Sequence, residues 1–365
     1  MWSDRRALDL FKIELPIIQA PMAGSSDAEL AVAVAQAGGL GSLPCAFLGV
    51  DQVRAAYQVI RQRTSRPVNL NFFCHAAPLA DAKRDEAWRN RLQHYYRELD
   101  LDFPATAAVA PRAPFDVSMC ALLEELKPPV VSFHFGLPAA SLVARVKASG
   151  AKVLSSATTV EEARWLEREG VDAVIAQGFE AGGHRGMFLT SDLATQIGTF
   201  ALVPQIVDAV RVPVIAAGGV ADARGVVAAL ALGAAAVQIG TAYLRCPEAT
   251  TSALHRAALT SASHDDTVLT NVFTGRPARG IVNRFIREQG PINELAPPFP
   301  LAADPSLPLR RKAEGQNSSD FSPLWSGQGG ALARPVPAGQ LTAQLAEAAM
   351  NRLRLEQFAR TPNEA

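Results

Sequence analysis

Short apolar runs alternate with longer amphipathic stretches along most of the chain. Eight of these runs are apolar almost throughout, which is typical of parallel strands that are covered on both faces. Helical patterning is clearest at residues 26–37, 50–62, 159–169 and 222–232, where Thr158 or Thr159 and Asp222 stand at expected N-cap positions. The predicted strands span residues 17–20, 41–43, 68–72, 130–135, 153–156, 173–177, 214–217 and 236–239.

This alternation predicts an α/β fold, and eight strand–helix repeats predict a TIM-like (β/α)8 barrel. The alternative is an open, doubly wound sheet, which usually carries a G-x-G-x-x-G motif after its first strand. Here the first predicted strand is followed by Pro-Met-Ala-Gly-Ser-Ser at 21–26. The sequence therefore favours the closed barrel.

Two segments exceed what a minimal barrel needs. Residues 76–128 follow the third predicted strand and are partly helical and then proline-rich, while residues 265–365 form a long C-terminal extension that ends in an amphipathic helix at about 338–358. We expect the barrel at 13–75 and 129–264, and we expect the two extra segments to form an added lobe, or lid, over the active-site end. A loosely attached tail is the alternative for the extension.

Composition excludes several classes of partner. Hydrophobic residues make up 48% of the chain, and the formal net charge is zero, so no basic field is expected to attract nucleic acid or an anionic membrane. The N-terminal residues contain no signal-peptide core, and the apolar runs at 30–50 and 226–240 are interrupted or too short to span a bilayer. We therefore expect a cytoplasmic protein.

The cysteines argue against a metal site. Cys45, Cys74, Cys120 and Cys246 lie far apart and form no C-x-x-C pair. Neither zinc nor a redox dithiol is expected from such spacing, whereas reduced cytosolic thiols are.

Glycine turns follow the last two predicted strands of the barrel. Gly218-Gly219 comes after the seventh strand and Gly240-Thr241 after the eighth. TIM barrels often bind phosphate between the loops after these two strands, where backbone N–H groups can approach the phosphate oxygens. The sequence therefore predicts a phosphate site.

Amide side chains stand at or near the ends of several strands, where the working residues of a barrel are expected. A buried amide is costly unless it is hydrogen-bonded. These amides either satisfy backbone groups at the barrel mouth or pair with the polar edge of a heteroaromatic ring, such as an isoalloxazine. They are Gln19, Asn69, Asn71, Gln177 and Gln238.

His184 is the strongest candidate for chemistry. It lies in Gly-Gly-His-Arg-Gly at 182–186, after a predicted strand end, and such a loop can hold a side chain over a pocket. A histidine there can take a proton or stabilise an anion. His134, at the end of the fourth strand, is a weaker candidate for substrate contact, and His75 is weaker still. Arg185 points either to a phosphate or to solvent, and the sequence does not decide between them.

The motifs at these positions, taken together and in order, resemble the class I nitronate monooxygenases, also called 2-nitropropane dioxygenases. The resemblance covers about residues 13–290. The segments that carry it are QAPMAG at 19–24, NLNFFCH at 69–75, SFHFGLP at 132–138, QGFEAGGHRG at 177–186, VPVIAAGGVADARG at 212–225, AVQIGTAYLRCPEA at 236–249 and FTGRPARGIVNRF at 273–285.

The resemblance implies a TIM-like barrel that binds FMN without a covalent bond. His184 matches the family's catalytic histidine. Pro21, Met22 and Ala23 would lie by the flavin ring. The remaining positions that would bind the cofactor are Asn71, Gln177, Gly182, Gly183, Gly218, Gly219, Gln238, Ile239, Gly240 and Thr241.

The implied reaction is the oxidation of an alkyl nitronate by O₂ to a carbonyl compound and nitrite, by way of a flavin semiquinone. Propionate 3-nitronate is the substrate that the resemblance suggests, in a detoxifying role, and nitronate and O₂ are the expected small-molecule partners. Related FMN barrels leave an alternative, an NAD(P)H-dependent quinone or enoyl-thioester reductase. A barrel that binds a flavin or a phosphorylated ligand without catalysis is a further alternative. The sequence does not distinguish a monomer from a dimer.

Overall fold

The computed structural model describes residues 2–79, 81–103, 113–261 and 266–360. Eight parallel strands form one sheet in the order β1–β9–β8–β6–β5–β4–β3–β2. A bridge between Ile18 and Leu40 joins the two edges, so the sheet closes into a barrel and the predicted (β/α)8 fold is confirmed. The strands are β1 (Ile17–Gln19), β2 (Gly41–Pro44), β3 (Val68–Phe73), β4 (Val130–His134), β5 (Lys152–Ala157), β6 (Ala173–Gln177), β8 (Val214–Ala217) and β9 (Ala236–Ile239).

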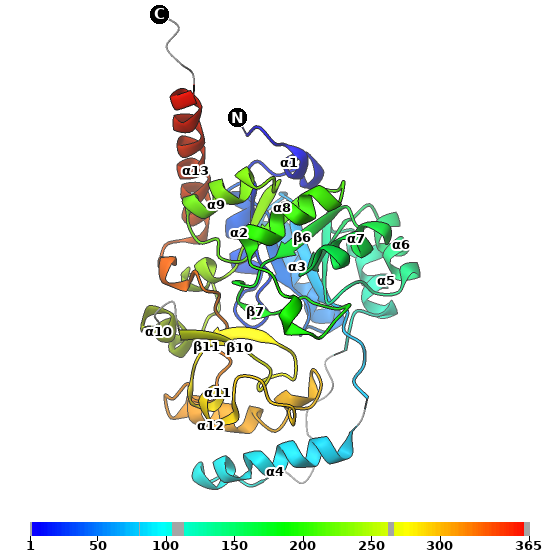
Figure 1. Cartoon of the computed structure of the whole chain (residues 1–365). Helices are drawn as coiled ribbons and strands as arrows, with labels where there is room; N and C mark the ends of the chain where they lie inside the picture. The colour runs from blue at the N-terminus through cyan, green and yellow to red at the C-terminus, as the bar shows by residue number, and fades with distance from the viewer. Residues whose placement is uncertain (1, 80, 104–112, 262–265, 361–365) are drawn as a thin grey trace, which may run out of the picture.

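Helices surround the strands (Figure 1). The expected N-caps at Thr159 and Asp222 are confirmed, because each side chain accepts a backbone N–H of the following helix. Asp27 caps α2 in the same way. The helices are α2 (Ala28–Gln36), α3 (Val50–Arg63), α5 (Val117–Leu126), α6 (Ala140–Ala148), α7 (Val160–Arg168), α8 (Thr199–Ala209) and α9 (Ala223–Ala231), with η2 (Thr241–Arg245) and α10 (Ala253–Ser261) after β9.

A short N-terminal helix, α1 (Arg6–Phe11), closes one end of the barrel. Its Leu8 and Phe11 are buried with Ile18, Leu154 and Ile215, which come from strands around the barrel. In Figure 1 this helix lies at the top of the barrel, on the side opposite the lobe that the insertion and the C-terminal extension form at the bottom. Access to the barrel interior is therefore left to the other end, where the carboxyl ends of the strands lie.

A second, smaller sheet lies at that other end (Figure 1). It consists of β10 (Thr267–Thr270), β11 (Ala278–Ile281) and β7 (Gly183–His184), all antiparallel. Two further helices of the extension, α11 (Arg284–Gln289) and α12 (Leu307–Gly315), lie beside this sheet. Because β7 belongs to the loop after β6, the small sheet joins the C-terminal extension directly to the barrel mouth.

The insertion contributes α4 (Ala82–Glu98) to this lobe. The buried Trp88 and Tyr95 of α4 pack against Phe285 and Phe321 of the extension, in one apolar group. The two predicted extra segments therefore pack against each other.

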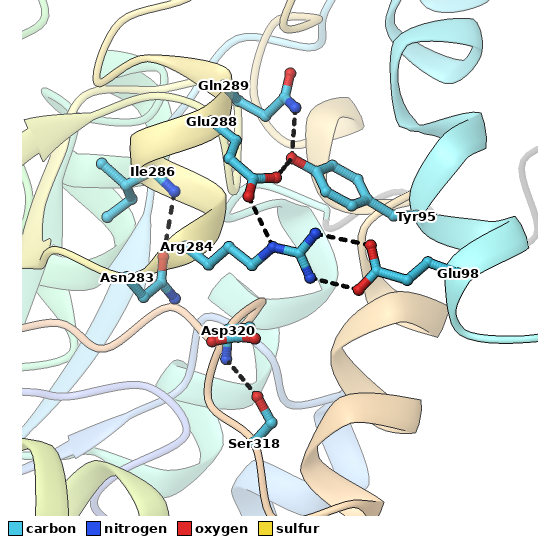
Figure 2. A network of polar contacts seen from close by, with 9 residues as sticks. All are labelled: Tyr95, Glu98, Asn283, Arg284, Ile286, Glu288, Gln289, Ser318 and Asp320. Carbon is cyan, nitrogen blue, oxygen red and sulfur yellow. Dashed lines mark hydrogen bonds and ion pairs between the residues drawn. The ribbon is translucent and has the colours of Figure 1, made fainter.

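Polar contacts fix α4 against α11 at the edge of this apolar group (Figure 2). The Arg284 guanidinium donates to both carboxylate oxygens of Glu98, at 2.5 and 2.7 Å, and its Nε donates to Glu288 at 2.8 Å. Glu288 also accepts from the hydroxyl of Tyr95, which accepts from Gln289 in turn, each at 2.7 Å. Burial, with the Glu288 carboxylate beside it, raises the pKa of Tyr95 to about 12, so this hydroxyl stays protonated and donates at neutral pH.

Two helices from the extra segments pack instead with the barrel. Leu123 of α5 and Leu341 of the last helix, α13 (Ala338–Arg360), belong to the apolar group between strands and helices, and Tyr243 and Thr342 share a hydrogen bond of 2.7 Å. The extra segments thus contribute helices to the barrel as well as to the lobe. The division of the chain at 76–128 and 265–365 into barrel and lobe stays a prediction. Most of the proline-rich stretch at 104–114 and the boundary at 264–265 lie outside the described residues.

Candidate active site

A cavity of about 490 Å³ lies at the carboxyl ends of the barrel strands, between the barrel and the lobe. The wall contains His134 and, with one exception, the residues that the family resemblance assigns to catalysis or to the cofactor. Ile239 is the exception, because its side chain is buried in the core. Its carbonyl accepts a hydrogen bond from the N–H of Ala20. The predicted residues on the wall are Pro21, Met22, Ala23, Asn71, His134, Gln177, Gly182, Gly183, His184, Gly218, Gly219, Gln238, Gly240 and Thr241.

The two glycine turns lie side by side, because β8 and β9 are paired. Gly218 has a φ of 111° and Gly219 a φ of 71°, and both values favour glycine. A Cβ on Gly218 would lie 3.0 Å from the N of Ala181 and 3.1 Å from the carbonyl oxygen of Gly178. The turn is therefore closely packed at the place where a phosphate was predicted.

A segment of the C-terminal extension forms a third wall beside these turns. The N–H of Gly327 donates to Oγ1 of Thr241 at 2.9 Å, and the N–H of Gln328 donates to the carbonyl of Glu180 at 3.0 Å. A Cβ on Gly182 would meet the N of Gly327 at 2.4 Å. Sequence reasoning missed this wall, since the tail after residue 290 carried none of the motifs that were assigned a role.

The strand-end amides divide into two kinds. Two of them satisfy protein groups inside the barrel: Oε1 of Gln19 accepts from the N–H of Ser42 at 2.8 Å, and Nδ2 of Asn69 donates to Oγ of Ser132 at 2.8 Å. Neither Gln19 nor Asn69 lies on the cavity wall. For these two residues, the interpretation as partners of the backbone and of neighbouring side chains is the one that the structure supports.

Gln177 reaches the cavity wall but also has protein partners at both ends of its amide. Its Oε1 accepts from the N–H of Gly186 at 2.7 Å, and its Nε2 donates to the carbonyl of His184 at 2.9 Å. Gln177 therefore fixes the backbone of the loop that carries the candidate catalytic histidine.

Asn71 and Gln238 keep polar atoms available on the wall. Asn71 donates through Nδ2 to Ser132, and within the described chain its Oδ1 accepts no hydrogen bond. Among the same residues, neither end of the Gln238 amide is hydrogen-bonded, and Gln238 is the one partly exposed residue of β9. These two amides are free to pair with a bound ring that carries donors and acceptors.

His184 lies in a cage of aromatic side chains. Its ring centroid is 5.4 to 6.1 Å from those of four aromatic residues, and its Nε2 lies 2.9 Å from Oγ1 of Thr274. Thr274 and two of the aromatic residues come from the C-terminal extension, and sequence analysis gave them no role. The aromatic residues are Phe73, Phe135, Phe299 and Trp325.

His134 holds the backbone of the same loop. Burial lowers the pKa of His134 to about 3, so its ring is neutral near pH 7. Because a carbonyl only accepts, Nε2–H of His134 donates to the carbonyl of His184 at 3.2 Å, and its Nδ1 accepts from the hydroxyl of Ser156 at 3.0 Å. This favours a positioning role for His134 over the substrate contact that the sequence suggested.

The pKa of His134 predicts a loss of stability in acid. The folded pKa, about 3, lies below the ordinary value of 6.5, so the neutral ring stabilises the fold fully above pH 6.5 and progressively less between pH 6.5 and 3. Between pH 7 and 5 the free energy of unfolding should fall by about 2 kcal/mol through this group. Urea unfolding of the wild type and of His134→Gln at both pH values measures this, and an equal fall in the two proteins would contradict it.

Arg185 points neither to a phosphate site nor to solvent. Its side chain is fully buried, and its guanidinium donates to the carbonyl oxygens of Gln177 and Gly178 and to the side chain of Gln196, at 2.7 to 2.9 Å. Burial lowers the pKa of Arg185 to about 10, which leaves it charged at neutral pH. His75 is also buried, beside Phe299, and does not line the cavity.

Two kinds of feature are absent from the described residues. No group of three or more His, Cys, Asp or Glu side chains is placed there to hold a metal ion. Among the helices of the same residues, none combines the length and the apolarity of a membrane span.

The sequence of the chain is similar to those of known proteins over nearly its whole length. A family described as nitronate monooxygenase matches residues 4–348 of the chain. A nitronate monooxygenase of Paraburkholderia phytofirmans is 41% identical over 343 residues, which is 93% of this chain and 94% of that protein.

Solved structures agree with this relationship. A nitroalkane oxidase from Streptomyces ansochromogenes superimposes with a TM-score of 0.86 at 39% identity, over 96% of this chain and 99% of that one. FabK from Thermotoga maritima superimposes with a TM-score of 0.74 at 29% identity, over 98% of this chain and all of that one. The similarity therefore includes the lobe as well as the barrel.

Proposed function

Because the chain belongs to the nitronate monooxygenase family, we propose that it oxidises alkyl nitronates with O₂ to a carbonyl compound and nitrite. The observation that carries the proposal is His184, enclosed by aromatic rings on the wall of a cavity that also contains two glycine turns and two available amides. Such a cavity can hold a phosphorylated cofactor with a polar ring and a small substrate beside it.

The wall residues fit FMN. Gly218 and Gly219 on one turn and Gly240 and Thr241 on the next would hold the phosphate, and Asn71 and Gln238 would pair with polar atoms of the isoalloxazine ring. Pro21, Met22 and Ala23 would lie by the ring, with Gly182 and Gly183 at the rim, whereas Gln177 would act through the loop that it holds. Bound FMN supplies the redox chemistry, since it takes electrons from the substrate and passes them to O₂.

The chain's own residues would bind and orient the substrate. A nitronate is already an anion, so its oxidation needs no proton abstraction at carbon. In this proposal His184 donates a hydrogen bond to the nitronate oxygens, and the aromatic cage excludes water so that this bond is strong. The tight cage suits a small substrate such as propionate 3-nitronate.

A reductase that uses NAD(P)H is the second candidate, and one observation favours it. The FabK structures superimpose over nearly the whole chain, at lower identity and TM-score than the nitroalkane oxidase. A barrel that binds its ligand without catalysis is disfavoured, because His184 has a defined hydrogen bond and an enclosed position. We also propose a cytoplasmic location, to which the four free cysteines are suited.

Steady-state assays test the proposed reaction. The purified, FMN-loaded chain is mixed in air with propionate 3-nitronate, with ethyl nitronate, or with neutral nitroethane, and nitrite release and O₂ consumption are recorded. We expect nitrite and O₂ uptake with the nitronates, and slower turnover of the neutral compound. No nitrite from either nitronate would refute the proposed function, and a colourless protein that cannot be loaded with FMN would refute the cofactor.

A further inference from the structure

We propose that Thr274 is a positioning residue for His184. By accepting a hydrogen bond from one ring nitrogen, Thr274 selects the edge of the imidazole ring that faces the substrate. The inference rests on the proposed function, because it concerns the orientation of the group that would contact the nitronate. Thr274 lies in the loop between β10 and β11, in the C-terminal extension, and its side chain is 6% exposed on the cavity wall.

The hydrogen bond between the two residues has a defined direction. Oγ1 of Thr274 lies 2.9 Å from Nε2 of His184 and 3.4 Å from the carbonyl oxygen of Arg276. A hydroxyl has one proton, and the carbonyl of Arg276 can only accept, so we assign the proton of Thr274 to that carbonyl. The lone pair of Oγ1 then accepts from the N–H at Nε2 of His184, which leaves Nδ1 as the ring nitrogen for the substrate. In the protonated ring, Nδ1–H is then the group that donates to the nitronate oxygens.

The backbone of His184 is fixed independently of Thr274. Its carbonyl accepts from both Gln177 and His134, and β7 pairs with β11 so that His184 lies opposite Ala278. These contacts fix where the side chain begins, but they do not fix the rotation of the ring about its last torsion.

Packing alone discriminates poorly between the two orientations of this ring. A half-turn about the bond from Cβ to the ring exchanges nitrogen and carbon positions while the outline of the ring hardly changes. The four rings around His184 therefore fit either orientation, whereas the hydroxyl of Thr274 accepts only from an N–H. This is the reason to assign the choice of edge to Thr274.

The loop that carries Thr274 is itself held in place. Gly275, at a φ of 86°, donates its N–H to the carbonyl of Asn271 at 2.7 Å. A Cβ on Gly275 would lie 1.9 Å from the carbonyl oxygen of Pro297, so the turn is wedged against another part of the lobe. The lobe thereby presents the hydroxyl at a fixed point beside the barrel mouth.

A pair of substitutions separates the hydrogen bond from the packing. Thr274→Val keeps the shape and removes the acceptor, whereas Thr274→Ser keeps the acceptor and removes a methyl group. We expect Thr274→Val to lower kcat for ethyl nitronate by about tenfold to a hundredfold, as a misplaced catalytic group does, while Thr274→Ser stays within about threefold of the wild type. The dissociation constant of FMN, measured by fluorescence quenching, should be unchanged in both.

A double variant supplies the second test. If Thr274 acts through His184, Thr274→Val should add no further loss of kcat in a His184→Gln background. Wild-type turnover in Thr274→Val, an equal loss in both Thr274 variants, or an additive loss in the double variant would each overturn the inference. A wild-type chain that turns over no nitronate would instead refute the proposed function, so the two failures are distinguishable.

Discussion

Replacing His184 with glutamine is expected to lower kcat for nitronates by at least about a hundredfold, while FMN stays bound. This expectation follows from the position of the His184 side chain in the cavity. His184 lies on the cavity wall inside the aromatic cage, and its carbonyl rather than its ring is what Gln177 and His134 hold. A glutamine preserves the backbone contacts and much of the volume, but it cannot carry a positive charge or present an imidazole N–H.

His94→Gln is the matched control. His94 is exposed on α4, and its Nδ1 contacts the carbonyl of Arg91 in the same helix. Its replacement should leave both kcat and FMN affinity within about twofold of the wild type, as surface substitutions usually do. Turnover by His184→Gln at the wild-type rate would remove His184 from the mechanism.

Gly218→Ala is expected to weaken FMN binding by about a hundredfold or more. An L-residue at a φ of 111° costs about 1–3 kcal/mol, and the new methyl group would meet atoms of Gly178, Ala181 and Thr199 at 3.0 to 3.1 Å. These atoms belong to the loop after β6 and to the start of α8, which pack against the Gly218 turn, so relief of the strain displaces the turn that would hold the phosphate. Equilibrium titration of the apoprotein with FMN measures the loss.

Gly150→Ala separates backbone strain from damage to the site. Gly150 has a similar φ of 96°, but a Cβ there would meet no atom within 4 Å, and the residue lies between α6 and β5, away from the cavity. The Gly150→Ala substitution should lower the melting temperature of the protein without changing its affinity for FMN. Equal FMN affinity in Gly218→Ala and the wild type would remove this turn from the phosphate site.

The barrel could be predicted because buried parallel strands leave a local signature. Each of the eight predicted strands lies within about two residues of an observed one, since continuous apolar runs between helical stretches leave few alternatives. Gly218 and Gly240 could be placed at the barrel mouth for the same reason, as they directly follow β8 and β9.

The small sheet could not be predicted from local pattern. β7 is a two-residue strand, Gly183–His184, and no periodicity can be read in two residues. It exists because β11, almost a hundred residues later, supplies its hydrogen-bond partners. For the same reason the sequence could not reveal that Phe299 and Trp325 enclose His184, or that Arg185 is buried.

The amides show where residue type stops being informative. Gln177 and Gln238 both occur at the end of a strand, after an apolar run. The first is held by the loop that folds back over it, and the second has no such loop, so only the second keeps its amide available. The difference is made by tertiary contacts that no single strand encodes.

Anaerobic spectroscopy distinguishes nitronate oxidation from NAD(P)H-dependent reduction in this cavity. The FMN-loaded chain is mixed without O₂ with propionate 3-nitronate and, in a separate cell, with NADH, and the flavin absorption is followed. We expect that the nitronate changes the flavin spectrum, that NADH does not, and that admitting air restores the oxidised spectrum with release of nitrite. Rapid bleaching by NADH, with no response to the nitronate, would contradict it and assign the cavity to a reductase.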